Sequence, residues 1–423
     1  PSHDQISAMT GNPRAFLWIA LALILWLNYE AWMRDYGPRP APSQTTAATA
    51  NGQPGGSEQG GLAQAVPEAS TPQAASAANG SGSHASVSSP VAGAVAAATG
   101  AGTVRVRTDV LDLEISLQGG TFTRADLLNY PVKKGESELV RLMNTAPGTL
   151  YLLQTGLTGP AGSDRPNHLA TFTSPQTEYR LDNAPELRVP LTWTDGAGVT
   201  VTKTYIFTPG SYRIDLEYTI ENRSDAPWQA AAYAQILRRD PVIERSWFTT
   251  NVENYAFRGP AIWDGGRYRK LDITDSDDRN LDIQVTNGWI AALQHHFVSA
   301  VVPPADTTYR FTLASEPQEF RIAAAGPMHA VEPGQTGRYE QRLFVGPKLQ
   351  AQLDTTGPEL ARVADYGKLT LLAAPLFWLL EKSYSVFGNW GWAIVFVTFL
   401  LKLLFYPLSE ASCRSMAKMK LLA

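Results

Sequence analysis

The chain has 423 residues, of which 44% are hydrophobic, 17% charged and 10% aromatic, and its formal net charge is −4. A mean hydropathy of −0.16 excludes a protein that lies mostly in lipid. The aromatic content excludes a wholly disordered chain, and the near-neutral charge gives no support to nucleic-acid binding. One cysteine cannot close an intramolecular disulfide, so the fold depends on its own core. The composition indicates a mixture of soluble and membrane parts.

A hydrophobic segment lies close to the N-terminus. Residues 16–27 read FLWIALALILWL, and neighbouring residues extend the segment to 14–33, the lower limit for a membrane span. A cleaved signal peptide is the alternative, but the residues that follow (NYEAWM) are bulky where a cleavage site needs small side chains. We therefore predict an uncleaved signal anchor. Residues 1–13 form its cytoplasmic flank, and residues 1–8 precede the first Met and are set aside as not necessarily native.

The next segment, residues 37–102, has the composition of a flexible linker, because it contains no aromatic residue and few charges. From Thr103 the pattern changes to short alternating runs separated by Gly, Pro or Asn turns. Such runs without intervening helical repeats predict a large, mainly β domain, an antiparallel β-sandwich over residues 103–346. Strands are expected at residues 104–107, 111–117, 187–194, 199–208, 212–221, 289–302, 309–314, 320–325 and 338–345.

Helical patterns follow the β-domain. Residues 347–366 predict a connecting helix that breaks near Gly357-Pro358. Residues 367–387 predict an amphipathic helix that lies in the outward-facing interface of the membrane that the chain crosses. Packing of this helix on the β-domain is the alternative. Residues 388–408 are apolar and long enough to cross ~30 Å of hydrocarbon, which predicts a second transmembrane helix. Basic residues within 409–423 place this end in the cytoplasm and the β-domain on the outer side of the membrane.

Lys402 interrupts the second span. Apolar residues of the span gain ~3–7 kcal/mol on insertion, whereas a Lys near its centre costs ~2.5–3.5 kcal/mol, so insertion is still favoured. Thr398 and Tyr406 lie four residues before and after Lys402, and the three residues therefore share one helix face. Two interpretations stay open at this point: the ammonium extends to the inner headgroups, or it faces a polar cavity inside the membrane.

The residues carry no motif of an enzyme. There is no nucleophile elbow, zinc-binding helix or phosphate loop, so no catalytic residue and no cofactor is predicted. His295 and His296 are adjacent in a predicted strand and would point to opposite faces, which argues against a metal site. The acidic cluster Asp275–Asp278 is expected to be a solvated turn. Cys413 is assigned a passive role.

Several segments of the chain resemble the YidC family of membrane protein insertases from Gram-negative bacteria. They are residues 108–113 (TDVLDL), 116–120 (SLQGG), 154–159 (QTGLTG), 388–392 (GNWGW), 398–408 (TFLLKLLFYPL) and 415–421 (SMAKMKL). The order of anchor, linker, β-domain, interfacial helix and second span also agrees with this family.

The resemblance implies a twisted β-sandwich similar to the sugar-mutarotase fold but without catalysis. It implies a multi-pass protein of the bacterial inner membrane that inserts and folds nascent membrane proteins, alone or with the Sec translocon (SecYEG, SecDF), and that meets the ribosome through cytoplasmic parts. In the family a positive residue of the second span lies in a polar groove. Lys402 matches this position, Thr398 matches a groove-lining residue and Tyr406 shares their face.

Two departures from the family pattern stand out. The family often has Arg at the position of Lys402, and a desolvated Lys can lose its proton where Arg cannot. The chain also stops in the first arm of a cytoplasmic helical hairpin, so we expect a fragment with an incomplete groove. The residues of this arm are Arg414, Met416, Lys418, Met419 and Lys420. The alternative function, based on the sandwich alone, is a membrane-anchored periplasmic carbohydrate-binding or envelope scaffold domain.

Overall fold

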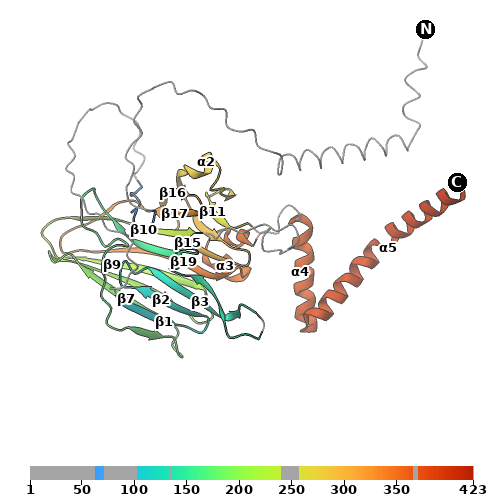
Figure 1. The fold of residues 1–423 in the computed structure, drawn as a ribbon, viewed down its shortest axis with the longest axis horizontal. Coiled ribbons are helices and arrows are strands. Elements are labelled where there is room, and N and C mark those ends of the chain that lie inside the picture. Colours follow the sequence, from blue (N-terminus) through green and yellow to red (C-terminus); the bar gives the residue numbers. More distant parts are fainter. Residues whose placement is uncertain (1–61, 71–101, 134, 240–256, 365–369, 423) are drawn as a thin grey trace, which may run out of the picture. The chain divides into compact units, whose positions relative to one another are not determined.

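A computed structural model describes residues 62–70, 102–133, 135–239, 257–364 and 370–422 of the chain (Figure 1). The predicted N-terminal span at residues 14–33 and most of the predicted linker lie outside the described residues. The described part contains a β-domain, a short helical connection and two long helices.

Strands of the β-domain form two sheets, one of 11 and one of 8 strands in the described part of the chain. The larger sheet contains β1 (Thr103–Arg107), β2 (Leu111–Ser116), β3 (Phe122–Pro131), β4 (Leu139–Met143), β5 (Tyr151–Thr158), β6 (Glu178–Arg180), β10 (Trp228–Arg239), β13 (Asp282–Thr286), β16 (Thr308–Glu316), β17 (Glu319–Ala325) and β18 (His329–Val331). The smaller sheet contains β7 (Leu187–Thr194), β8 (Val199–Phe207), β9 (Arg213–Asn222), β11 (Gly259–Trp263), β12 (Tyr268–Lys270), β14 (Trp289–Leu293), β15 (Phe297–Val302) and β19 (Thr336–Pro347).

Pairing between these strands is antiparallel except for β1 with β6. In the larger sheet β10 lies between β5 and β17, and in the smaller sheet β19 lies between β15 and β9. Side chains of β9 alternate between buried and half-buried positions along the whole strand, as expected for a sheet with one inner face. One hydrophobic core contains residues of both sheets, including Phe122, Leu153 and Ile220. The predicted antiparallel β-sandwich is confirmed.

The sequence pattern missed or misread several strands. The predicted strand at 289–302 is wrong, because β14 and β15 form a hairpin whose turn contains His295 and His296. Central strand β10 was missed, since its residues are buried on both faces and the run AAAYAQ shows no alternation.

The acidic cluster Asp275–Asp278 forms more than a turn. Asp275 accepts a hydrogen bond from the backbone N–H of Asp277 and caps the short helix α2 (Ser276–Arg279).

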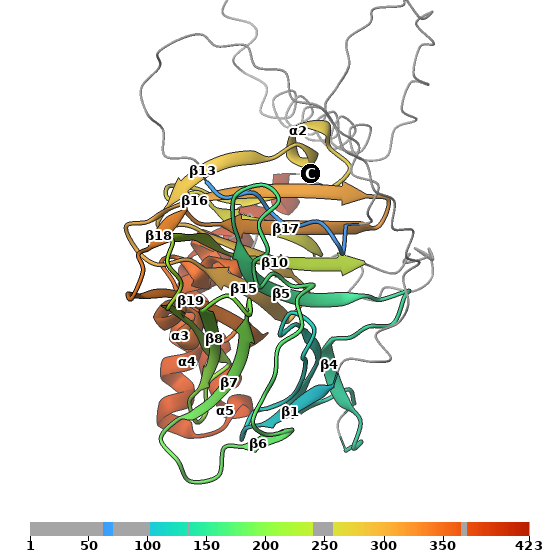
Figure 2. The ribbon, with the colours of Figure 1, turned by 90° about the vertical axis from the view of Figure 1, so that its left-hand side faces the viewer.

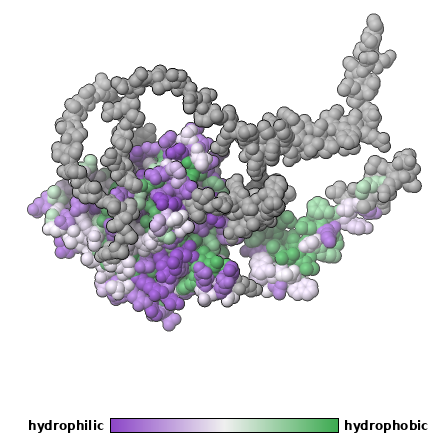
Figure 3. All heavy atoms as spheres, viewed as in Figure 1, coloured by the Kyte–Doolittle hydropathy of each residue, from purple (hydrophilic) through white to green (hydrophobic). Residues whose placement is uncertain are grey.

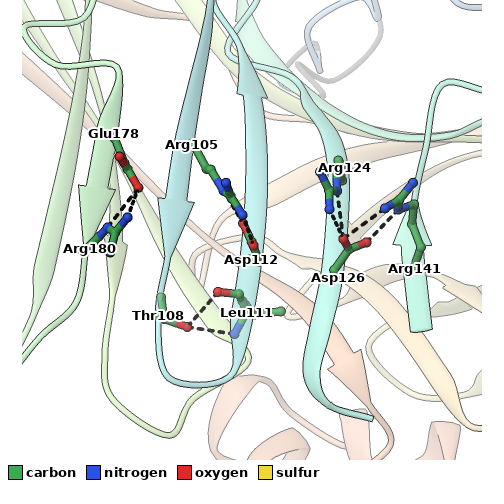
Figure 4. Close-up of polar contacts among 9 residues, drawn as sticks. All are labelled: Arg105, Thr108, Leu111, Asp112, Arg124, Asp126, Arg141, Glu178 and Arg180. Carbon is green, nitrogen blue, oxygen red and sulfur yellow. Dashed lines mark hydrogen bonds and ion pairs between the residues drawn. The ribbon is translucent and has the colours of Figure 1, made fainter. Parts of the chain in front are cut away.

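Ion pairs stabilise one end of the larger sheet (Figure 4). The side chain of Arg105 on β1 donates two hydrogen bonds, of 3.0 and 2.6 Å, to the Asp112 carboxylate on β2. The nearly buried Asp126 of β3 is held between Arg124 and Arg141. Burial alone would raise the pKa of Asp126, but the hydrogen bonds from both guanidinium groups hold it below its usual value.

The connection after the β-domain follows the prediction for residues 347–366. Helix α3 (Gln350–Thr356) ends at Gly357, and a 3-10 turn, η2 (Leu360–Val363), follows Pro358. Leu353 and Leu360 are fully buried, and the indole N–H of Trp289 donates to the carbonyl of Pro358 at 2.9 Å. These contacts hold the connection against β14.

Lys203 lies fully buried on the inner face of β8. Its amino group donates to the carbonyls of Gly119 (2.7 Å) and Thr155 (2.9 Å), which belong to the larger sheet and its β2–β3 turn. Gly119 and Gly120 have φ of +71° and +63°, and a Cβ on Gly120 would lie 2.9 Å from Lys203 Nζ, so the turn requires glycine here. Burial lowers the pKa of Lys203 well below its usual value.

Replacing Lys203 by Met should change how stability depends on pH. A neutral Lys203 in the folded chain gains a proton on unfolding at pH values between its lowered pKa and the ordinary value of 10.5. The free energy of unfolding should therefore rise with pH by up to about 1.4 kcal/mol per pH unit in this window. Thermal unfolding followed by circular dichroism at about pH 8 to about pH 9.5 should give a smaller slope for Lys203→Met, whereas Lys133→Met, at an exposed lysine, keeps the wild-type slope. Equal slopes for all three proteins would contradict the neutral buried lysine.

Candidate functional site

The second long helix carries the residues that the sequence singles out. Helix α4 (Thr370–Phe387) and helix α5 (Trp390–Leu422) are joined by Gly388 and Asn389. Gly388 has φ of +62° and its N–H donates to the Tyr384 carbonyl, which ends α4. The Asn389 side chain accepts from the N–H of Gly391 at 2.7 Å and caps α5. The motif GNWGW is therefore the turn of a helical hairpin.

The two helices contact each other near this turn. The rings of Tyr384 and Trp390 stack with centroids 4.1 Å apart, and the rings of Phe387 and Phe396 are 5.3 Å apart. Small or medium side chains fill the contact: Ser383, Ala393 and Val397 are buried. The hydroxyl of Ser383 donates to the carbonyl of Leu379 at 2.7 Å, so its polar group is paired inside its own helix. The sequence interpretation did not identify this contact.

The rest of α5 exposes apolar side chains (Figure 3). Its segment Trp390–Pro407 has a mean hydropathy of 1.6, and this is the one helix in the described part of the chain that is long and apolar enough to cross a membrane. The helix has 33 residues and continues through Pro407. The helix therefore continues across the predicted boundary between the span (388–408) and the hairpin arm (409–423), because no Gly or capping residue ends it there. At ~1.5 Å per residue α5 measures roughly 50 Å.

Thr398, Lys402 and Tyr406 are all exposed on α5, and 64% of Tyr406 is accessible. A helix turns by ~100° per residue, so the three positions fall within an arc of ~80°. The Thr398 hydroxyl donates to the Ile394 carbonyl at 2.5 Å. Phe399 and Leu403 next to this face are exposed as well. Lys402 thus lies with Thr398 and Tyr406 on one exposed face, and exposed apolar side chains flank it.

The predicted hairpin arm lies on the same helix, with Arg414, Lys418 and Lys420 in its last turns. Met416 is exposed. The roles predicted for these residues stay predictions. Among the described residues, no group of three or more His, Cys, Asp or Glu side chains could hold a metal ion. The ring centroids of His295 and His296 are 4.0 Å apart, so the prediction that their side chains point to opposite faces of a strand was wrong. The two residues belong to no such group of possible metal ligands in the described part of the chain.

A large β-sandwich followed by an exposed apolar helix defines the class of the protein: a β-domain attached to a membrane anchor. Sequence comparison specifies the family. The profile of the YidC periplasmic domain matches residues 103–379, and the profile of the 60Kd inner membrane protein matches residues 382–423. The chain belongs to the YidC family.

Relatives in this family are similar over most of the chain. The membrane protein insertase YidC of Nitrosococcus oceani is 37% identical over 423 residues, which cover 97% of this chain and 71% of the relative. The insertase of Methylococcus capsulatus is 41% identical over 399 residues, covering 93% of this chain and 68% of the relative. The protein is therefore an inner-membrane protein of the insertase family, as the sequence motifs indicated.

Solved structures also match the β-domain. A galactose mutarotase related enzyme from Lactobacillus acidophilus is 10% identical, with a TM-score of 0.36, and the match covers 57% of this chain and 97% of that protein. A putative aldose 1-epimerase from Escherichia coli K12 gives 10% identity and a TM-score of 0.33, covering 58% and 99%. Likeness at this level supports no statement about activity.

A bulky side chain at the α4–α5 contact should destabilise the hairpin. Ala393 is fully buried there, so Ala393→Phe overpacks the contact at a cost of ~1–3 kcal/mol. The matched substitution Ile394→Phe, one residue further on an exposed position, should have little effect. Helical circular dichroism during thermal unfolding in detergent compares the two. Equal midpoints for Ala393→Phe and Ile394→Phe would show that the contact contributes nothing to stability.

Proposed function

We propose that the protein inserts and folds membrane proteins in the bacterial inner membrane, using the face of α5 that carries Lys402. The observation that carries this proposal is the match of 37% and 41% identity, over nearly the whole chain, to proteins named membrane protein insertase. The exposed apolar surface of α5 supports it, because such a surface is stable only against lipid or another apolar segment. No catalytic step is required, since insertion moves a segment without breaking covalent bonds.

Lys402 supplies the polar element of this surface. An ammonium facing bare hydrocarbon would cost ~2.5–3.5 kcal/mol, and a hydrated groove beside α5 removes much of that cost. In such a groove the positive charge attracts the acidic flank of an incoming segment, by ~1–4 kcal/mol at 4 Å depending on hydration. Thr398 and Tyr406 extend the polar strip on the same face. Apolar side chains beside it, such as Phe399, contact the apolar part of the client.

The proposed topology places both α5 and the N-terminal segment 14–33 across the membrane. The β-domain lies in the periplasm and the end of α5 in the cytoplasm, because Arg414, Lys418 and Lys420 follow the apolar segment. Helix α4 exposes Trp378 and Val386, which suits a position in the outer interface. The proposed partners are nascent membrane proteins and lipid, together with the Sec translocon and the ribosome. No observation on the described residues of the β-domain favours carbohydrate binding.

Removing the charge at position 402 should reduce insertion of clients with acidic external tails. Lys402→Ala should lower the inserted fraction about fivefold, the effect of losing ~1 kcal/mol of attraction, whereas Lys402→Arg should keep it. Protease protection of the client tail in membrane vesicles, with the substitutions made in the cell's own insertase gene, measures this fraction. Lys382→Ala on α4 removes another exposed lysine and serves as the matched control. Wild-type insertion by Lys402→Ala would rule out the electrostatic role.

The single cysteine offers a direct test of orientation. Cys413 lies in α5 after the apolar segment, so a membrane-impermeant maleimide should label it in inverted vesicles and fail to label it in spheroplasts. The reverse pattern is expected for a Cys413→Ser variant that carries Lys133→Cys, because Lys133 is an exposed residue of the β-domain. Labelling of Cys413 from the outside would invert the proposed topology.

A further inference from the structure

Nine residues of the predicted linker are bound to the β-domain. Residues 62–70 (LAQAVPEAS) cross the larger sheet from β5 to the start of β16, and they are coloured blue in Figure 2. The prediction of a flexible linker over 37–102 is therefore wrong for these residues. Low apolar content favours an undocked linker, but this segment is held mainly by hydrogen bonds to its backbone.

Three side chains of the β-domain donate to carbonyls of this segment. The Ala63 carbonyl accepts from His168 Nε2 at 3.0 Å and from Gln154 Nε2 at 3.4 Å. The Ala65 carbonyl accepts from an Arg321 guanidinium nitrogen at 2.7 Å. Hydrogen bonds to backbone carbonyls do not depend on which side chains the bound segment carries. Proteins bind extended peptides through such backbone hydrogen bonds.

The far end of the segment pairs with backbone just after β17. The N–H of Ser70 donates to the Gly326 carbonyl at 3.0 Å, next to the end of β17, and Ser70 forms a parallel bridge with Pro327. One contact selects a side chain: Glu68 forms an ion pair of 3.1 Å with Arg310. The segment is thus recognised as an extended chain with a carboxylate five residues after the first bound carbonyl.

Contacts within the β-domain orient these donors. With the segment bound, His168 and Gln154 are more than nine-tenths buried. The Tyr233 hydroxyl lies 2.6 Å from His168 Nδ1 and donates to it, because Nε2 must carry the proton that Ala63 accepts. Burial lowers the pKa of His168 to about 4, so the imidazole stays neutral and keeps this donor at neutral pH.

A second buried amide lies below Gln154. Gln235 is fully buried on β10, and its Nε2 donates to the Gln154 side-chain oxygen at 2.7 Å. Its own oxygen has no hydrogen-bond partner among the described residues. The hydrogen bond from Gln235 occupies the Gln154 oxygen and so orients the Gln154 amide with its Nε2 toward the Ala63 carbonyl.

The site extends beyond the bound segment. A cavity of about 650 Å³ lies beside Val66, Pro67 and Glu68, and Arg279, Arg310 and Arg321 line it from the β-domain. Asp282 is also on its wall and pairs with Arg310 at 2.8 Å. Arg310 therefore binds two carboxylates at this wall, Asp282 of the β-domain and Glu68 of the bound segment.

We propose that this face of the larger sheet is a binding site for an extended acidic peptide, which residues 62–70 occupy in the absence of a competing chain. The competing ligand is an extended segment of another polypeptide with small residues and a carboxylate. Residues 62–70 stay covalently attached to the β-domain when they are displaced. Their effective concentration at the site is then ~1 mM. This inference holds whether or not α5 inserts membrane proteins.

A fluorescent peptide with the sequence of residues 60–72 (GGLAQAVPEASTP) tests the site in the full chain in detergent. A variant with residues 62–70 replaced by Gly and Ser at the same length should bind the peptide at least about tenfold more tightly than the wild type, because the internal competitor is gone. Fluorescence anisotropy measures the affinity, and near-ultraviolet circular dichroism shows that the variant is folded. Equal affinities, or no binding to the folded variant, would overturn the proposal.

Three further substitutions, two in the protein and one in the peptide, separate specific from nonspecific binding. In the variant with residues 62–70 replaced by Gly and Ser, Arg310→Met should weaken peptide binding about fivefold. A peptide with Gln in place of Glu68 should also bind about fivefold more weakly, and Arg310→Met should not weaken its binding further. Arg188→Met, an exposed arginine of β7, should leave the affinity unchanged. Equal losses from Arg310→Met and Arg188→Met would indicate nonspecific attraction. Competition by galactose or glucose, rather than by unlabelled peptide, would assign the site to carbohydrate and overturn the proposal.

Discussion

The buried amino group of Lys203 connects the two sheets of the β-domain. It extends from β8 of the smaller sheet to two carbonyls of the larger sheet, at Gly119 and Thr155. Tyr205, two residues along β8, donates to the neighbouring Gly120 carbonyl at 2.6 Å and accepts from the Thr155 hydroxyl at 3.1 Å. These bonds fix the turn after β2 and the position of β5. Because β5 also carries Gln154, the site on the outer face depends on the same strand.

This network explains the segments that indicated the family. The SLQGG segment is the glycine turn over Lys203, and the QTGLTG segment is β5, with Thr155 facing inward and Gln154 outward. Gly156 leaves room for Tyr233, since a Cβ there would lie 2.8 Å from its hydroxyl. The TDVLDL segment forms the β1–β2 turn, where Thr108 accepts from the N–H of Leu111 at 2.9 Å (Figure 4). The motifs are structural, and they support function by positioning polar groups.

The sequence predicted the sandwich, most alternating strands, the break at Gly357-Pro358 and a helix carrying Thr398, Lys402 and Tyr406, because each follows from local periodicity or turn chemistry. It did not predict β10, buried on both faces, or the docking of residues 62–70, because backbone hydrogen bonds leave no side-chain pattern. One signal was overlooked: Lys203 stands at an inward position of the alternating run VTVTKTYIF, where only a paired or neutral lysine is tolerated.

The central claim is that one face of α5 contacts clients during insertion. Photo-crosslinking from position 402 tests it most directly, with position 404 as the control, since Leu404 is exposed but lies ~200° around the helix. With a client segment stalled during synthesis in membrane vesicles, we expect strong crosslinks to the segment from position 402 and from 398, and weak ones from 404. Equal crosslinks from 402 and 404, or none from 402, would contradict it.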